Sequence, residues 1–160
     1  MKLLTHYVFS MGLLTLLLAL GRNPFPESLF LALIMSVTGN LIIDGLGHEE
    51  RRGYVRRTPL THTIPRSIFW GALPGIAIII LLYYLSGRMI ELIYVEIILS
   101  SLLMGPSHMI LDIFTERGIF VKRRGRWVRL ALAHFSYNDV LVNGAAMIMG
   151  LLMIFTAYSI

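Results

Sequence analysis

The sequence predicts an all-α membrane protein in which about five helices cross the bilayer and form a single domain over residues 1–160. Two observations predict this class. Apolar residues make up 56% of the chain and charged residues only 14%, unlike the composition of a soluble domain. Several apolar stretches also reach the roughly 20 residues that a helix needs to cross a bilayer core of about 30 Å. Because these stretches occupy most of the chain, no large soluble domain fits in the remainder.

Each expected span is dominated by Leu, Ile, Val, Ala, Met or aromatic residues. The first apolar run follows Lys2 and could instead be a secretory signal. We expect a retained span, because a signal has an apolar region of roughly 7 to 15 residues and this run is longer. The expected spans are residues 3–20, 28–46, 67–86, 92–114 and 139–160.

Basic residues distinguish the two sides of the predicted membrane domain. The loops 47–66 and 115–138, together with Lys2, hold twelve of the fourteen Lys and Arg residues, and the opposite connections hold only Arg22 and Arg88. Short loops rich in Lys and Arg stay in the cytoplasm. We therefore expect a multi-pass protein of the plasma membrane with a cytoplasmic N-terminus and an external C-terminus. Within the second loop, residues 127–134 are expected to form a short amphipathic helix at the interface.

The chain has no cysteine, which excludes disulfides, thiolate metal sites and a cysteine nucleophile. Any metal must be held by His, Asp or Glu. The predicted topology brings all five histidines to the cytoplasmic face, where two aspartates also end spans. The candidate metal ligands are His6, Asp44, His48, His62, His108 and Asp112.

Residue spacing favours metal binding by these side chains. Asp44 and His48 are four residues apart, as are His108 and Asp112, and such pairs lie within about 6 Å on one helix face. Imidazole and carboxylate together suit zinc, which we expect, or manganese or iron. Six candidates are enough for two ions that share a bridging water. Ionisable residues inside spans are costly to bury, which also favours a functional role.

Some of the remaining polar residues are expected to assist the candidate ligands, and others are expected to lie outside the site. Threonine hydroxyls flank His62 and are expected to orient its imidazole or a bound water. His134 has no carboxylate at ligand spacing and is expected at the interface. Either His62 or His134 could transfer protons if it is not bound to metal. Glu96 lies roughly 18 Å along the helix from His108, so we expect it outside the site.

The basic loops set the orientation and meet anionic lipid headgroups. Guanidinium groups also bind phosphate through two hydrogen bonds, which suggests a phosphorylated or lipid substrate in addition to membrane lipids as partners. Nucleic acid is a weaker candidate, because no nucleic-acid-binding motif accompanies the charge. The expected anion-binding residues are Arg56, Arg57, Arg123 and Arg124.

The order of these motifs resembles a known family over roughly residues 5–118. The motifs are Thr5-His6, Asp44 with His48, Leu60-Thr61-His62-Thr63, and His108 with Asp112 behind Gly105-Pro106. They resemble the predicted membrane-bound metal-dependent hydrolases, also described as LexA-binding, inner-membrane-associated hydrolases, and especially their short archaeal relatives. The resemblance implies a metal-dependent hydrolytic activity that uses the same six ligands. Three departures are that no second aspartate accompanies Asp44, that Arg57-Thr58 stands where the family often has His-Arg, and that Thr63 replaces a serine.

Two functions from different classes follow. The first is a metal-dependent hydrolase with a cytoplasm-facing site that cleaves an ester, especially a phosphoester of a lipid or other anionic substrate. The alternative is a non-catalytic membrane interaction or structural protein whose His/Asp cluster stabilises helix packing. Ion transport is disfavoured, because the polar residues gather at one end of the spans.

Overall fold

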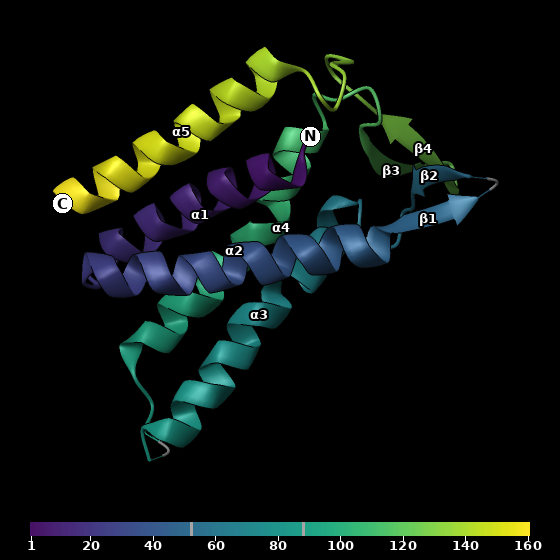
Figure 1. The fold of residues 1–160 in the computed structure, drawn as a ribbon. Helices are drawn as coiled ribbons and strands as arrows, with labels where there is room; N and C mark the ends of the chain where they lie inside the picture. The colour runs from purple at the N-terminus through teal and green to yellow at the C-terminus, as the bar shows by residue number, and fades with distance from the viewer. Residues whose placement is uncertain (52, 88) are drawn as a thin grey trace.

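The computed structural model describes residues 1–51, 53–87 and 89–160. Arg52 and Arg88, two of the basic residues used to predict the orientation, lie outside them. Five helices in the described chain are long and apolar enough to cross a membrane, which confirms that prediction. They are α1 (Leu3–Leu20), α2 (Phe25–Gly47), α3 (Ile64–Leu85), α4 (Leu92–Asp112) and α5 (Val140–Ser159) (Figure 1).

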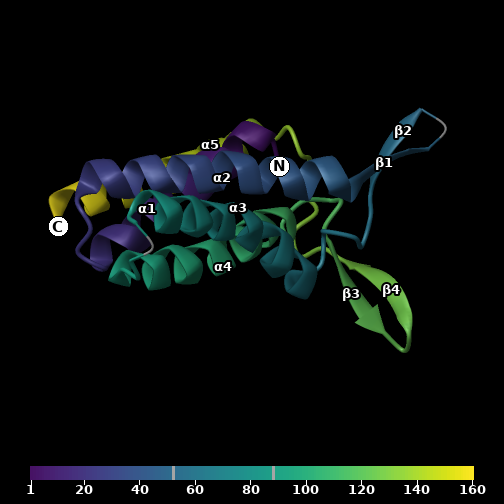
Figure 2. The same ribbon diagram turned by 90° about the horizontal axis from the view of Figure 1, so that it is seen from below.

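Helix α1 is the centre of the bundle and packs against α2, α4 and α5, while α3 packs mainly on α4 (Figures 1 and 2). Small residues allow the closest crossings. A Cβ added to Gly105 in α4 would overlap the backbone carbonyl of Ser67 in α3, and one on Gly12 in α1 would overlap the backbone of Gly150 in α5. Close crossings at small residues are typical of helices packed in a bilayer, where van der Waals contact replaces the hydrophobic effect.

The bundle's interior combines polar and apolar side chains, and its exterior is rich in exposed apolar residues. His6, Asn40 and His108 are fully buried, whereas Leu92 and Leu141 are exposed on the outside. An exposed apolar belt around buried polar side chains is the arrangement expected of a helical protein in lipid. The fold is therefore compatible with a multi-pass membrane protein.

The ends of the helices explain small differences from the expected spans. Helix α3 begins three residues early, because the Thr63 hydroxyl accepts a hydrogen bond from the backbone N–H of Arg66 and Pro65 fits the first turn. Helix α5 begins at Val140, capped by the Asp139 carboxylate, which accepts from the N–H of Val142. These caps belong to sequence just outside the apolar runs.

Two short antiparallel hairpins make the all-α expectation incomplete. They are β1 (His48–Arg51) with β2 (Tyr54–Arg57), and β3 (Ile119–Arg123) with β4 (Arg126–Leu130). The prediction of an amphipathic helix at 127–134 is wrong, because β4 occupies the first half of this segment and residues 131–134 are not helical. Arg124 and Gly125 both adopt positive φ (49° and 78°), the conformation of a tight two-residue hairpin turn. The β-branched and aromatic residues flanking this turn favour strands.

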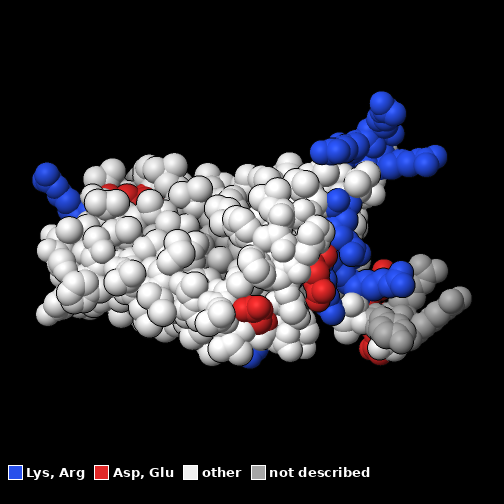
Figure 3. Space-filling model, turned by 90° about the horizontal axis from the view of Figure 1, so that it is seen from above, with Lys and Arg blue, Asp and Glu red and all other residues white. Residues whose placement is uncertain are grey.

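Both hairpins lie at the end of the bundle that holds the N-terminus, and the C-terminus lies at the other end (Figures 1 and 2). Most Lys and Arg side chains visible in Figure 3 gather at the hairpin end. This charge asymmetry is the one from which a cytoplasmic N-terminus is predicted, and the orientation in a membrane stays a prediction.

Candidate metal centre

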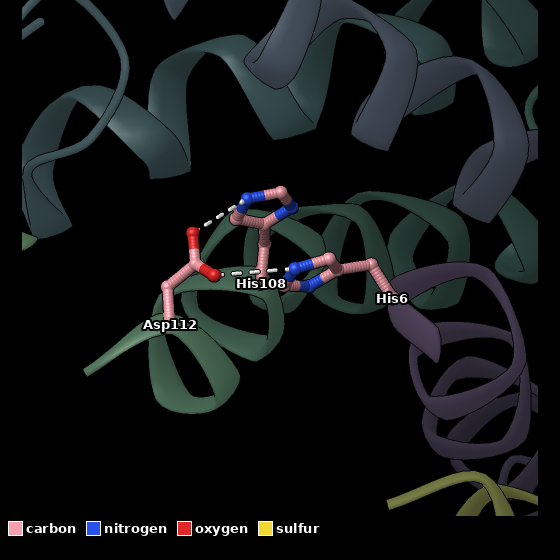
Figure 4. Close-up of side chains that lie close together, drawn as sticks. All are labelled: His6, His108 and Asp112. Atoms are coloured by element: carbon pink, nitrogen blue, oxygen red, sulfur yellow. Dashed lines mark ion pairs between the residues drawn. The ribbon is translucent and has the colours of Figure 1, made fainter. Parts of the chain in front are cut away.

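The last turn of α4 and the first turns of α1 bring three of the predicted ligands together (Figure 4). His108 Nε2 lies 3.1 Å from Asp112 Oδ2, and His6 Nε2 lies 3.2 Å from Asp112 Oδ1. The two imidazole rings stack with their centroids 3.8 Å apart. All three side chains are completely buried. The helical spacing of His108 and Asp112 therefore puts both on one face, as the sequence predicts.

Asp44 at the end of α2 gathers a second group. Its Oδ1 atom lies 3.4 Å from both His62 Nε2 and His108 Nε2, and 3.6 Å from His48 Nδ1. His62 Nε2 is also 3.7 Å from Asp112 Oδ2. These distances join the two groups into one cluster, so the structure brings all six predicted metal ligands together. Either group, His6 with His108 and Asp112 or Asp44 with His48 and His62, could hold a metal ion.

Several atoms at the centre of the cluster are buried and lack a hydrogen-bond partner within the described chain. They include His6 Nε2, Asp44 Oδ1, His62 Nε2, His108 Nε2 and Asp112 Oδ2. Polar atoms buried without partners are costly, and they are rare in folded proteins. Ligand atoms about 2.0 to 2.2 Å from a tetrahedral zinc ion stand about 3.3 to 3.6 Å apart, which is close to the His–Asp distances here. The donor set therefore fits a divalent ion.

Hydrogen bonds on the outer side of two imidazoles turn them toward the centre. His108 Nδ1 lies 2.6 Å from the side-chain oxygen of Asn40, whose amide donates to Ser36 O (2.8 Å). His62 Nδ1 lies 2.9 Å from the Thr61 hydroxyl, which itself donates to a backbone carbonyl. Both partners can therefore accept a hydrogen bond from a protonated Nδ1, which leaves the Nε2 lone pair for a metal. The role expected for the hydroxyls beside His62 falls to Thr61, whereas Thr63 caps α3.

His62 is the cluster histidine supplied by the connection between β2 and α3. Burial lowers its pKa from 6.5 to about 4, against the opposing effect of the nearby Asp44 carboxylate. The imidazole is therefore neutral at pH 7, the form in which histidine binds metals.

Arg57 contacts the cluster through Asp112. Its side chain is only 6% exposed, and its guanidinium donates to Asp112 Oδ1 (2.7 Å) and to the Gly118 carbonyl (3.0 Å). The amino group of Met1 also contacts Asp112 Oδ1 (2.8 Å). The spacing of residues in the sequence did not predict the contact of Asp112 with Arg57 or with Met1. Arg57 thus pairs with a candidate metal ligand, and its expected role in substrate binding stays a prediction.

Four other candidates do not meet the cluster. Arg56 is exposed in β2, Arg123 and Arg124 are exposed at the tip of the β3–β4 hairpin, and His134 is exposed in the connection before α5. In the part of the chain that the structure describes, none of them forms a hydrogen bond or ion pair with the six ligands. The hairpin carries the two tip arginines outward instead of folding them over the site.

The cluster is open on one side. Asp44 and His48 are 21% and 23% exposed, whereas the side chains of His6, His62, His108 and Asp112 are fully buried. A molecule that approaches from the hairpin end would therefore meet Asp44 and His48 first.

Fold and site together describe a bundle of helices that are long and apolar enough to cross a membrane, around a buried His/Asp centre that could hold a metal ion. A family model matches residues 1–111, so the chain belongs to the family described as Protein of unknown function (DUF1286). The matched stretch includes five of the six candidate ligands and ends directly before Asp112. The searches of curated proteins and of solved structures found no match.

Proposed function

We propose that this protein is a metal-dependent hydrolase of the plasma membrane that cleaves an ester, especially a phosphoester of a lipid or other anionic substrate, at its cytoplasmic face. The observation that carries the proposal is the convergence of buried, unpartnered carboxylate and imidazole atoms from α1, α2, α4 and the connection before α3. The resemblance of the ordered motifs to membrane-bound metal-dependent hydrolases supports the same reaction class. The description of the DUF1286 family names no activity.

Zinc is the metal we propose, with manganese and iron as alternatives. His62, His108, Asp44 and Asp112 would hold the first ion, and His6 lies beside them. A bound divalent ion lowers the pKa of its water from 15.7 towards about 7 and polarises the scissile group.

The protein's own groups have separate tasks in this proposal. Asn40 and Thr61 hold two imidazoles in the metal-binding orientation. Arg57 offsets the charge of Asp112 inside the bundle. His48 lies at the opening, and its Nδ1 donates to the Asp44 backbone carbonyl (2.7 Å), which leaves Nε2 to accept a proton from the nucleophile. We assign proton transfer to His48 in place of His62 or the distant His134.

Elemental analysis tests the proposal. The detergent-purified chain is compared with a His108→Ala/Asp112→Ala variant after loosely bound ions have been removed. The matched control is His134→Ala/Glu116→Ala, which removes one imidazole and one carboxylate from exposed positions. We expect one or two equivalents of metal in the native protein and the control, but not in the variant. Turnover of phosphoesters and phospholipids by the loaded protein should follow the same pattern.

A second function is favoured by the way the cluster joins three helices. His6 from α1, Asp44 from α2 and Asp112 from α4 meet within one group of contacts, which is what a non-catalytic membrane interaction protein would need to fix its helix packing. This alternative predicts a loss of thermal stability in the double variant without any turnover by the native protein. Failure to bind zinc, manganese or iron even after supplementation would contradict the hydrolase and leave this alternative.

A further inference from the structure

We infer that the pocket between the first turn of α3 and the β3–β4 hairpin binds the headgroup of an anionic phospholipid. The pocket has a volume of about 390 Å³, within the usual range for small-molecule sites. Ile64, Arg66, Phe120, Lys122 and Trp127 are among the residues that line it. It lies outside the proposed metal centre, and the inference does not depend on catalysis.

Two cations meet one aromatic ring in this pocket. The guanidinium carbon of Arg66 lies 5.0 Å from the centroid of the Trp127 ring, and Lys122 Nζ lies 5.9 Å from it. Arg66 also donates to the carbonyl of Pro59. Neither cation forms an ion pair with a carboxylate in the described residues. Both cations contact the Trp127 ring without a neutralising carboxylate, and a phosphate bound beside the ring would supply the missing anion.

The rest of the hairpin carries the same unbalanced charge. Residues 117–138 contain no Asp or Glu. Within the described chain, none of the basic residues there forms an ion pair. Figure 3 shows Lys and Arg side chains gathered at this end of the molecule. These basic residues are Arg117, Lys122, Arg123, Arg124, Arg126 and Arg129.

A lipid fits this pocket better than a polynucleotide, because the lining changes from cationic to apolar next to a membrane-length helix. Ile64 in the first turn of α3 is 49% exposed, and Phe120 and Val121 of β3 also line the pocket. Trp127 is 40% exposed beside the first turn of α3, and tryptophan is enriched at membrane interfaces. A phospholipid can place its phosphate between Arg66 and Lys122 and its glycerol and upper acyl carbons against the apolar wall.

Strand β3, which lines the pocket, also contacts the connection between β2 and α3 that supplies His62. The Phe120 N–H donates to the His62 carbonyl (2.8 Å). A headgroup bound at Lys122 would therefore lie two residues along the strand from a contact with a candidate metal ligand, which places a lipid beside the proposed site.

The chain has only two tryptophans, so its own fluorescence can report binding. In a Trp70→Phe background, Trp127 is the sole reporter. The full chain in detergent micelles is titrated with short-chain phosphatidylglycerol at about 150 mM salt, where the Debye length is about 8 Å. We expect a saturable change in Trp127 emission, and a much weaker response to phosphatidylcholine of the same chain length.

Paired charge variants locate the site. Arg66→Gln/Lys122→Gln should weaken phosphatidylglycerol binding roughly 30-fold, since each basic residue contributes about fivefold. Arg123→Gln/Arg124→Gln removes the same charge at the hairpin tip and should change the affinity by less than about threefold, because salt screens distant charges. Arg66→Lys/Lys122→Arg keeps both charges and should retain binding. Far-UV circular dichroism checks that each variant is folded.

Three results would overturn the inference. They are an equal loss in both glutamine pairs, equal affinity for the two lipids, and displacement of phosphatidylglycerol by an equimolar oligonucleotide. The first would indicate a diffuse charged surface, the second an apolar groove without headgroup recognition, and the third a nucleic-acid surface. None of them would alter the metal content of the protein, so they are distinguishable from a failure of the proposed function.

Discussion

His108 Nδ1 lies 2.6 Å from the side-chain oxygen of Asn40, in a contact between α4 and α2 that is completely buried. The Asn40 amide group donates to the Ser36 carbonyl, so its oxygen is the atom that faces the imidazole. This arrangement makes Nδ1 the protonated nitrogen of His108 and directs the Nε2 lone pair toward Asp44 and Asp112.

We predict that Asn40→Leu lowers metal affinity about 10- to 100-fold, because loss of an outer hydrogen bond frees the imidazole to rotate. Competition with a chelator of known affinity measures the effect. The control is Asn138→Leu, which removes an exposed amide. Unchanged affinity in Asn40→Leu would show that Asn40 is not needed to orient His108.

Removal of the Arg57 guanidinium should strongly destabilise the protein. Its side chain and that of Asp112 are almost completely buried, so Arg57→Leu leaves the buried carboxylate with only the Met1 amino group as a cation in contact with Oδ1. Breaking a buried pair from one side costs about 3 to 5 kcal/mol. Thermal unfolding in detergent measures the loss.

Arg56→Leu is the matched control for that experiment, because Arg56 is the adjacent residue of β2 and is exposed. Its unfolding should change by less than about 0.5 kcal/mol. Equal effects of the two substitutions would contradict the pairing of Arg57 with Asp112.

The tight crossing of α3 and α4 depends on Gly105. Because a Cβ there would overlap the Ser67 carbonyl, we predict that Gly105→Ala destabilises the fold by about 1 to 3 kcal/mol. Gly45→Ala is the control, since a Cβ at Gly45 in α2 meets no atom within 4 Å. That substitution should be neutral or stabilising by up to about 1 kcal/mol, because alanine favours a helix. Destabilisation by Gly45→Ala alone would reverse the expected order.

The parts of this structure that are encoded locally could be predicted from the sequence. Apolar runs of membrane length predicted the five helices, and the four-residue spacing of His108 and Asp112 predicted their shared face. The β3–β4 hairpin was missed, because its basic and apolar residues also fit an amphipathic helix. The turn at Arg124 and Gly125 was the signal that favoured strands.

Contacts between distant residues could not be predicted in the same way. Arg57 and Asp112 are 55 residues apart in sequence, and nothing in the local pattern of either identifies the other as its partner. Basic residues were expected to surround the cluster because they share its end of the molecule. A shared end of the bundle does not imply contact, since Arg123 extends outward on the hairpin.

Removing one imidazole at a time tests whether His48 or His134 transfers the proton. His48→Ala should reduce any phosphoester hydrolysis about 100-fold or more, the usual contribution of a general base. His134→Ala should leave it unchanged, because His134 is exposed and makes no contact with the cluster in the residues described. Rates are measured with metal-saturated proteins of verified metal content. Loss of activity in His134→Ala, with His48→Ala unaffected, would reverse the assignment.

Metal removal should lower the stability of the native chain, because an ion that binds only the folded state stabilises it in proportion to its affinity. At a free metal concentration 100 times the dissociation constant, the gain is about 2.7 kcal/mol. We predict that Asp44→Asn loses most of this gain, since Asp44 Oδ1 faces His48, His62 and His108. Glu96→Gln should keep it, because Glu96 bonds to Asn23 at the opposite end of α4. Unfolding in detergent, followed with and without chelator, measures each difference. Equal stability of the native chain under both conditions would mean that no ion holds these helices together.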